Sequence, residues 1–125
     1  MTNATLTKSD CIRDLNDAFR RSFVGGVVLL TTGVEAMPAD RRRCLLQHVR
    51  IFTAFSGDND PHGEHDFGAI DQDGVRCFWK VDYYDRDMNM GSPDPADHAV
   101  TTRVLTIMLA DEYCPVRRVV APTSI

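Results

Sequence analysis

The chain has 125 residues, of which 43% are hydrophobic and 26% are charged, a composition typical of one compact globular domain. It contains no apolar run near the roughly 20 residues that a membrane-spanning helix needs, and its polar first ten residues do not resemble a secretion signal. These features disfavour a membrane protein, and we expect a cytoplasmic one. The four cysteines include no C-x-x-C pair, which disfavours a disulfide scaffold or a structural zinc site.

The first half of the chain predicts two helices with a strand between them. Apolar side chains recur at helical spacing over residues 9–23, after a pair of capping hydroxyls. Residues 27–32 are a β-branched apolar run, typical of a buried strand. Pro38 suits the first turn of a second helix that continues to Phe52.

The central part predicts a loop followed by a β-hairpin. Residues 58–66 are rich in the turn-forming residues Asp, Asn, Pro and Gly. Residues 67–71 and 75–84 have the pattern of two strands joined by an Asp-Gly turn. In the second strand, alternation predicts that one side faces the core, namely Cys77, Trp79, Val81 and Tyr83.

The last third of the chain predicts a further helix. Residues 85–97 form a loop, in which Pro95 offers a helix start. Apolar spacings of four and three favour a helix over residues 99–110, although alternation over residues 105–109 also suits a strand. Residues 119–121 suggest an edge strand in the tail.

Together these elements predict the α+β class. We expect a small antiparallel β-sheet of about three to four strands, including the hairpin, packed against two to three helices. We also expect a flexible N-terminus over residues 1–8, a single domain over residues 9–114 and a C-terminal tail over residues 115–125.

Charge is distributed unevenly along the chain. Residues 58–97 hold eleven acids and three bases, a net charge of −8, whereas the remainder has a net charge of +4. Such a segment repels phosphates and therefore disfavours nucleic-acid binding. It suits a metal, a cationic partner, mimicry of nucleic acid, or simply a solvated acidic face. The arginines at 41–43 point in different directions around a helix, which favours a solvated or salt-bridged face over a phosphate site.

The loop of residues 58–66 contains the densest cluster of potential metal ligands. His62 and His65 lie three residues apart and could join nearby carboxylates around a transition metal. The spacing differs from H-E-x-x-H, and local hydrogen bonding at the surface explains the same residues. The candidate metal ligands are His62, His65, Asp60 and Asp66.

Alternation also places charged and aromatic side chains together on the outer face of the hairpin. The predicted binding surface consists of Glu64, His65, Asp66, Lys80, Asp82, Tyr84 and Asp85. Aromatic rings beside charges are typical of binding hot spots, whereas acid/base catalysis also requires a cleft and shifted pKa values. The pattern favours a protein-binding surface over a catalytic one, and we assign no catalytic residue.

Four ordered blocks of the sequence form a recognisable pattern. They are residues 59–68 (NDPHGEHDFG), 78–85 (FWKVDYYD), 91–95 (GSPDP) and 102–110 (TRVLTIMLA), with residues 15–20 (LNDAFR) before them. Over about residues 10–113 the chain resembles a family of small bacterial proteins named domain of unknown function 3768. The resemblance implies carriage on plasmids and other mobile elements, and a role in transfer, maintenance or evasion of host defence. It implies no catalytic residues.

Two functions are therefore expected. The first is a non-enzymatic, cofactor-free protein that inhibits a protein partner through its acidic, aromatic surface. In a mobile element the partner would belong to a bacterial defence complex, which makes the protein an anti-CRISPR or antirestriction factor. The alternative is a metal-dependent hydrolase that uses His62, His65 and nearby carboxylates, with Lys80 or Tyr84 as proton donor. Nucleic-acid binding through Arg50 and the arginines at 41–43 is disfavoured by the acidic half.

Overall fold

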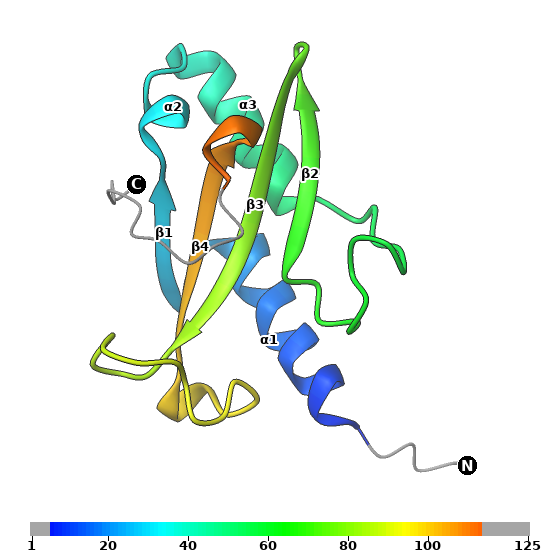
Figure 1. The fold of residues 1–125 in the computed structure, drawn as a ribbon, viewed down its shortest axis with the longest axis vertical. Coiled ribbons are helices and arrows are strands. Elements are labelled where there is room, and N and C mark those ends of the chain that lie inside the picture. Colours follow the sequence, from blue (N-terminus) through cyan, green and yellow to red (C-terminus); the bar gives the residue numbers. More distant parts are fainter. Residues whose placement is uncertain (1–5, 114–125) are drawn as a thin grey trace.

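A four-stranded β-sheet organises the molecule, which a computed structural model describes over residues 6–113. The strands are β1 (Gly26–Leu30), β2 (Phe67–Gln72), β3 (Val75–Tyr84) and β4 (Thr102–Leu109), in the spatial order β1-β4-β3-β2. β1 pairs in parallel with β4, and the other neighbours are antiparallel. The sheet is therefore mixed and mostly antiparallel (Figure 1).

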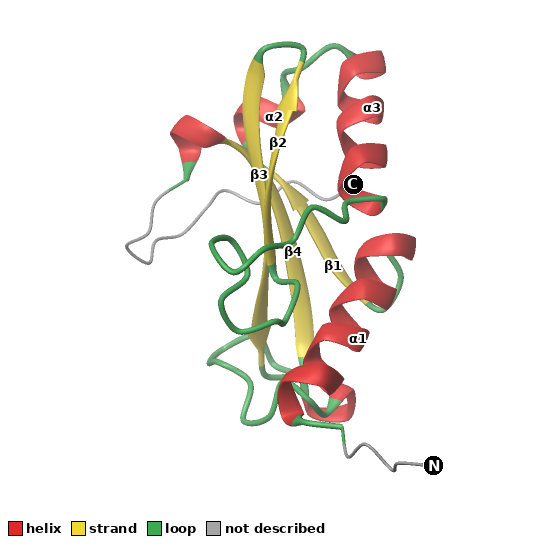
Figure 2. Ribbon diagram, turned by 90° about the vertical axis from the view of Figure 1, so that its right-hand side faces the viewer, coloured by secondary structure: helices red, strands yellow, loops and turns green. Residues whose placement is uncertain are grey.

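The helices of the described part complete a two-layer α+β fold, which confirms the predicted class. They are α1 (Lys8–Ser22), the short α2 (Thr32–Glu35) and α3 (Ala39–Arg50), with 3-10 turns at His98–Val100 and Ala110–Glu112. Both long helices lie on one side of the sheet (Figure 2). None of the helices described is long and apolar enough to cross a membrane.

Local sequence accounts for the start and end of α1. Thr7 accepts a hydrogen bond from the backbone N–H of Asp10 at 3.0 Å, and the Asp10 carboxylate accepts one from the backbone N–H of Thr7 at 3.1 Å. This capping box satisfies N–H groups that the first turn leaves free. The helix ends at Phe23, whose φ of 60° is left-handed. The predicted first helix is confirmed.

The predicted hairpin is confirmed, including its turn. Asp73 and Gly74 have φ angles of 53° and 83°, as a two-residue turn of the mirror-image type requires. Alternation in β3 buries Cys77, Trp79 and Val81 on the helix side of the sheet. The side of β3 predicted to face the core therefore does so.

The predicted helix over residues 99–110 is wrong, because residues 102–109 form strand β4. β4 lies in the interior of the sheet, between β1 and β3. Side chains on both of its faces are buried, including Val104 and Leu105. A strand buried on both faces reads as a continuous apolar run, and its alternation is masked.

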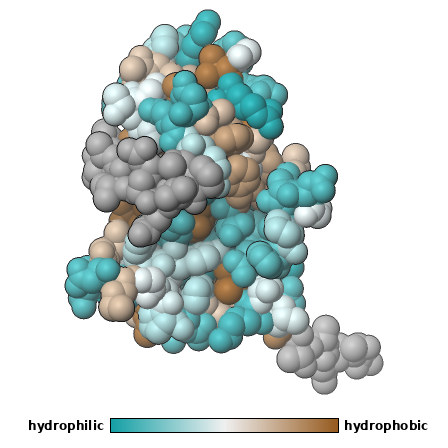
Figure 3. Space-filling view, in the orientation of Figure 1, coloured by the Kyte–Doolittle hydropathy of each residue, from teal (hydrophilic) through white to brown (hydrophobic). Residues whose placement is uncertain are grey.

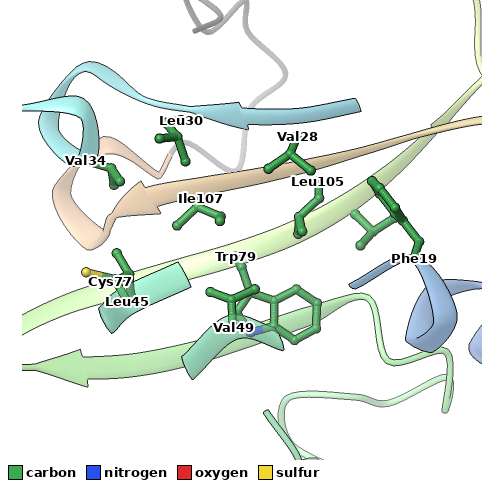
Figure 4. Close-up of a cluster of buried hydrophobic side chains, with 11 residues drawn as sticks. Phe19, Val28, Leu30, Val34, Leu45, Val49, Cys77, Trp79, Leu105 and Ile107 are labelled. Carbon is green, nitrogen blue, oxygen red and sulfur yellow. The ribbon is translucent and has the colours of Figure 1, made fainter. Parts of the chain in front are cut away.

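The core lies between the sheet and the two long helices (Figure 4). Trp79 at its centre is completely buried and lies opposite Ile107 of β4 and Gly68 of β2. α3 contributes Leu45 and Val49 to the same core, with Val49 drawn next to Trp79 and Leu45 next to Cys77 in Figure 4. The predicted tail over residues 115–125, with its edge strand, lies outside the described residues.

Candidate functional site

The structure separates the predicted binding surface into two groups on opposite faces of the sheet. Trp79 and Val81 of β3 are buried on the helix side. Because side chains alternate along a strand, Lys80, Asp82 and Tyr84 share the face away from the long helices. Glu64, His65 and Asp66 precede β2, and the side chains of Glu64 and His65 contact Tyr83 and Asp17 on the helix side. The expectation that His65 or Asp66 meets Lys80, Asp82 and Tyr84 is therefore wrong. The backbone N–H of Val81 donates to the Asp66 carbonyl at 2.9 Å, so Asp66 lies opposite Val81 and on its side of the sheet.

His65 is held between two carboxylates on the helix side. Its Nδ1 lies 2.9 Å from an Asp17 oxygen, and its Nε2 lies 3.6 Å from an Asp60 oxygen. Its ring stacks on Phe55 with a centroid separation of 3.7 Å. The backbone at His65 is left-handed, with a φ of 55°, and its N–H donates to Asp60 at 3.0 Å. Asp60 therefore fixes both the backbone and the ring of this histidine.

Arg20 connects the same carboxylate to the end of α3. Its Nη2 donates to Asp17 at 2.9 Å, and its Nη1 lies within hydrogen-bond distance of the carbonyls of Val49, Arg50 and Phe52. The last carbonyls of a helix have no partner within the helix. Arg20 supplies that partner for α3, and its side chain is only 1% exposed.

A second polar network lies beside the first and crosses from α1 to the sheet. Asn16 donates to the hydroxyl of Tyr83 at 2.8 Å and to the backbone carbonyl of Glu64 at 3.0 Å. The Tyr83 hydroxyl donates to the Glu64 carboxylate at 3.1 Å, and Arg103 Nε donates to Asn16 at 2.7 Å. Burial is the main cause that raises the pKa of Tyr83, so its phenol stays protonated and remains a donor.

The carboxyl of Asp66 is partly buried next to the charge of Glu64. Burial, followed by the negative charge of Glu64, raises the pKa of Asp66. No side chain in the described residues donates a hydrogen bond or forms an ion pair to this carboxyl. A partly buried carboxylate without a cation costs folding free energy. The ionised Asp66 carboxylate therefore lowers the stability of the folded state.

The four candidate metal ligands do not converge. His62 is exposed, whereas both ring nitrogens of His65 face carboxylates that already bind other donors. Across residues 6–113, no group of three or more His, Cys, Asp or Glu side chains has the geometry to hold a metal ion. Residues 58–66 instead form a hydrogen-bonded loop that contacts α1 through His65 and Asp17.

The other face of the sheet combines charge with aromatic rings. Lys80 Nζ lies 3.0 Å from an Asp82 oxygen, and both side chains are about one third exposed. Phe67, Phe78 and Tyr113 form a cluster in which ring centroids lie 5.2 to 5.9 Å apart. We call these five residues together with Tyr84 the outer sheet surface. Figure 3, which views the molecule from this side, shows apolar and polar residues next to one another.

The arginines at 41–43 do not form one patch. Arg41 lies 3.7 Å from Asp73 in the acidic segment, and Arg42 donates to the backbone carbonyls of Glu35 and Met37. The salt-bridged interpretation therefore holds for Arg41. Arg50 likewise donates to a backbone carbonyl, that of Arg21.

Sequence reasoning missed the residues that organise the helix side, and a signal for them existed. Asn16 and Arg20 lie in the buried stripe of α1 that also contains Ile12 and Phe19. A polar residue inside an apolar stripe indicates a buried hydrogen-bond network. Arg103, within the apolar run of β4, carries the same signal.

A mixed four-stranded sheet, with long helices on one face and a polar, aromatic surface on the other, defines a small two-layer α+β protein. The chain belongs to the family described as "Protein of unknown function (DUF3768)", whose sequence model matches residues 30–112. The match confirms the resemblance and runs from the end of β1 to the turn after β4. Searches of curated proteins and of solved structures returned no match.

Proposed function

We propose that the protein is a non-enzymatic binding factor that contacts a protein partner through the outer sheet surface. The observation that carries the proposal is that Lys80, Asp82 and Tyr84 of β3 lie on the face of the sheet that neither long helix covers (Figure 2). Rings next to charges are the side chains that contribute most binding energy in protein interfaces. The accessible part is on β2 and β3, because Val104, Thr106 and Met108 of β4 are buried.

The charge of the surrounding segment favours a basic partner. Of the eleven acids in residues 58–97, five have a basic group within 4.0 Å among the described residues. Asp58, Asp87 and Asp97 are exposed and have no such partner. Unpaired surface carboxylates attract and orient a positively charged surface. They therefore suit a groove that otherwise holds nucleic-acid phosphates.

Such a groove is a feature of bacterial defence nucleases, and the family resemblance implies carriage on mobile elements. We therefore propose that the partner is a component of a restriction or CRISPR complex and that binding inhibits it. Transformation of hosts that carry such a system tests this role. Expression of the protein is expected to raise the uptake of a targeted plasmid and to leave an untargeted plasmid unaffected. Equal uptake in every defence background would reject the counter-defence role.

The surface itself is tested by affinity capture with a double variant. Asp82→Arg combined with Tyr84→Ser reverses one charge and removes one ring on the outer sheet surface. Asp14→Arg is the matched control, since it makes the same charge change on α1, where Asp14 hydrogen-bonds only with Arg13 among residues 6–113. A stoichiometric partner is expected with the wild type and the control but not with the double variant. Retention of the partner by a double variant with an unchanged circular dichroism spectrum would refute the assignment.

A further inference from the structure

A cavity of about 510 Å³ lies at the end of the sheet, and its lining residues include neither a residue of the outer sheet surface nor His65 or its partners Asp17, Asp60 and Phe55. It is bounded by the second half of α1, the turn before β1 and the connection between β3 and β4, which lies at the lower end of the sheet in Figure 1. Phe19, Thr101 and Arg103 form its buried base, and Val24, Arg86 and His98 are its exposed rim. Its volume is within the range of small-molecule sites.

The base of this cavity holds a buried cation without a counter-ion. Arg103 is 4% exposed, and no carboxylate of the described residues lies within the ion-pair distance of 4.0 Å. Burial is the main cause that lowers the pKa of Arg103. The charge of Glu64 opposes this effect from beyond 4.0 Å, and the Glu64 carboxylate already accepts from Tyr83. Buried charges in proteins are normally paired, because desolvation of a lone charge is costly.

The guanidinium of Arg103 also has an unused donor. Among the described residues, Nε donates to Asn16 and Nη2 donates to the backbone carbonyl of Pro95, but Nη1 has no acceptor. The fully buried side-chain nitrogens that lack a partner in this part of the chain are Arg20 Nε and Trp79 Nε1. Arg103 Nη1 is not among them, and Arg103 lines the cavity. Nη1 is free to bind an acceptor that enters the cavity.

The rest of the lining adds positive charge and apolar surface but no acid. Arg86 lies at the rim, where its Nη1 donates to the Thr101 carbonyl at 3.4 Å. His98 is a second rim residue and carries charge when protonated. Leu15, Phe19 and Val24 supply apolar walls. In a chain with more acids than bases, a cavity lined only by cationic and uncharged groups is selective for anions.

We infer that this cavity binds a small organic anion, with one carboxylate or phosphate group on Arg103 and Arg86 and an apolar body against α1. Arginine suits this role, since its planar donors match both oxyanions. The inference does not depend on the proposed partner-binding role, because no residue of the outer sheet surface lines the cavity.

Titration of the ¹⁵N-labelled protein, followed by NMR, tests the inference. The probes are phenyl phosphate and benzoate, with phenol as the neutral body and inorganic phosphate as the bare anion. At least one organic anion is expected to bind about tenfold more tightly than phenol and inorganic phosphate. Saturable shifts are expected at the amides of Gly25 and Thr101. Comparison of the two organic anions distinguishes a phosphate ligand from a carboxylate ligand.

Variants at the exposed rim locate the site without disturbing the core. Arg86→Gln is expected to weaken binding about tenfold, as loss of one charge-assisted contact does, and Val24→Glu is expected to abolish it by repulsion. Arg76→Gln is the matched control, because Arg76 is an exposed arginine on the hairpin. Equal affinity for phenol and the organic anions, unchanged affinity in Arg86→Gln, or shifts outside the cavity would overturn the inference.

Discussion

The indole of Trp79 lies directly against the backbone of Gly68 on the neighbouring strand. A Cβ atom at Gly68 would be 2.3 Å from Trp79 Nε1 and 2.9 Å from a ring carbon of Phe52. No side chain fits at this position while the ring keeps its place, because interiors are close-packed. The largest buried side chain of the core therefore depends on a strand residue that has no side chain.

Gly68→Ala is expected to lower the free energy of unfolding by about 2 to 3 kcal/mol, since the added methyl overpacks the core. Urea denaturation checks this value. Gly57→Ala is the control, because a Cβ there meets nothing within 4 Å, and it is expected to change stability by less than about 0.5 kcal/mol. Equal effects of the two substitutions would contradict the packing argument.

Arg20→Lys is expected to destabilise the protein by about 3 kcal/mol. Lysine keeps the charge but lacks the planar fork that reaches both Asp17 and the carbonyls at the end of α3. Arg21→Lys is the matched control, because Arg21 is exposed and lies 4.0 Å from the same aspartate. Denaturation of both variants measures the difference, and similar midpoints would show that the α3 contacts contribute little.

Tyr83→Phe is expected to cost about 1 to 2 kcal/mol, because it leaves Asn16 and Glu64 without the shared hydroxyl. Tyr84→Phe serves as the control, since no hydrogen bond to the Tyr84 hydroxyl is present among the described residues. The raised pKa of Tyr83 gives a second readout. The tyrosinate absorbance of the folded protein at about pH 11 is expected to be the same in wild type and Tyr83→Phe. A smaller absorbance in the variant would show that Tyr83 ionises.

Glu112 is expected to stabilise the folded state at neutral pH. Burial alone would raise the pKa of Glu112, but hydrogen bonds from Thr31, Leu109 and Gly33 outweigh it and lower the pKa. A lowered pKa contributes stability above the unfolded value of about 4.3, and the contribution is lost as pH falls through the folded pKa.

Glu112→Gln is accordingly expected to cost about 1 kcal/mol at pH 7, a value that allows for solvent screening. The variant should lose less stability than the wild type when the pH falls from about 5 to about 3. Urea unfolding at several pH values measures both effects. If the stabilities of wild type and variant fell in parallel with pH, Glu112 would not be the source of the pH dependence.

The ionised Asp66 carboxylate is expected to destabilise the folded state at neutral pH, the opposite of Glu112. Its raised pKa means that the folded state prefers the protonated carboxyl, so the contribution favours folding below the unfolded value of about 3.9 and is lost as pH rises through the folded pKa. Asp66→Asn is therefore expected to raise stability at pH 7 by a few tenths of a kcal/mol, since the group is partly solvated. The gain should vanish near pH 3. Melting curves at both pH values check it, and a destabilised variant at pH 7 would contradict the prediction.

The sequence by itself determined the elements whose signals lie in residues close together along the chain. The capping hydroxyls before residue 10 predict the start of α1, and the Asp-Gly turn at Asp73 and Gly74 predicts the hairpin. Alternation in β3 then predicts that Trp79 faces the core. Each of these features depends on residues within a few positions of one another, so their physical cause can be read directly from the chain.

Only the tertiary structure decided what depends on distant residues. β4 is a strand because β1 and β3 flank it, and burial on both faces hides its alternation. His65 meets Asp17, which lies 48 positions earlier in the chain, and this contact places the acidic loop on the helix side of the sheet. The cavity around Arg103 likewise forms where α1 meets the connection between β3 and β4. Such contacts arise from the packing of separate elements, which no local pattern of residues specifies.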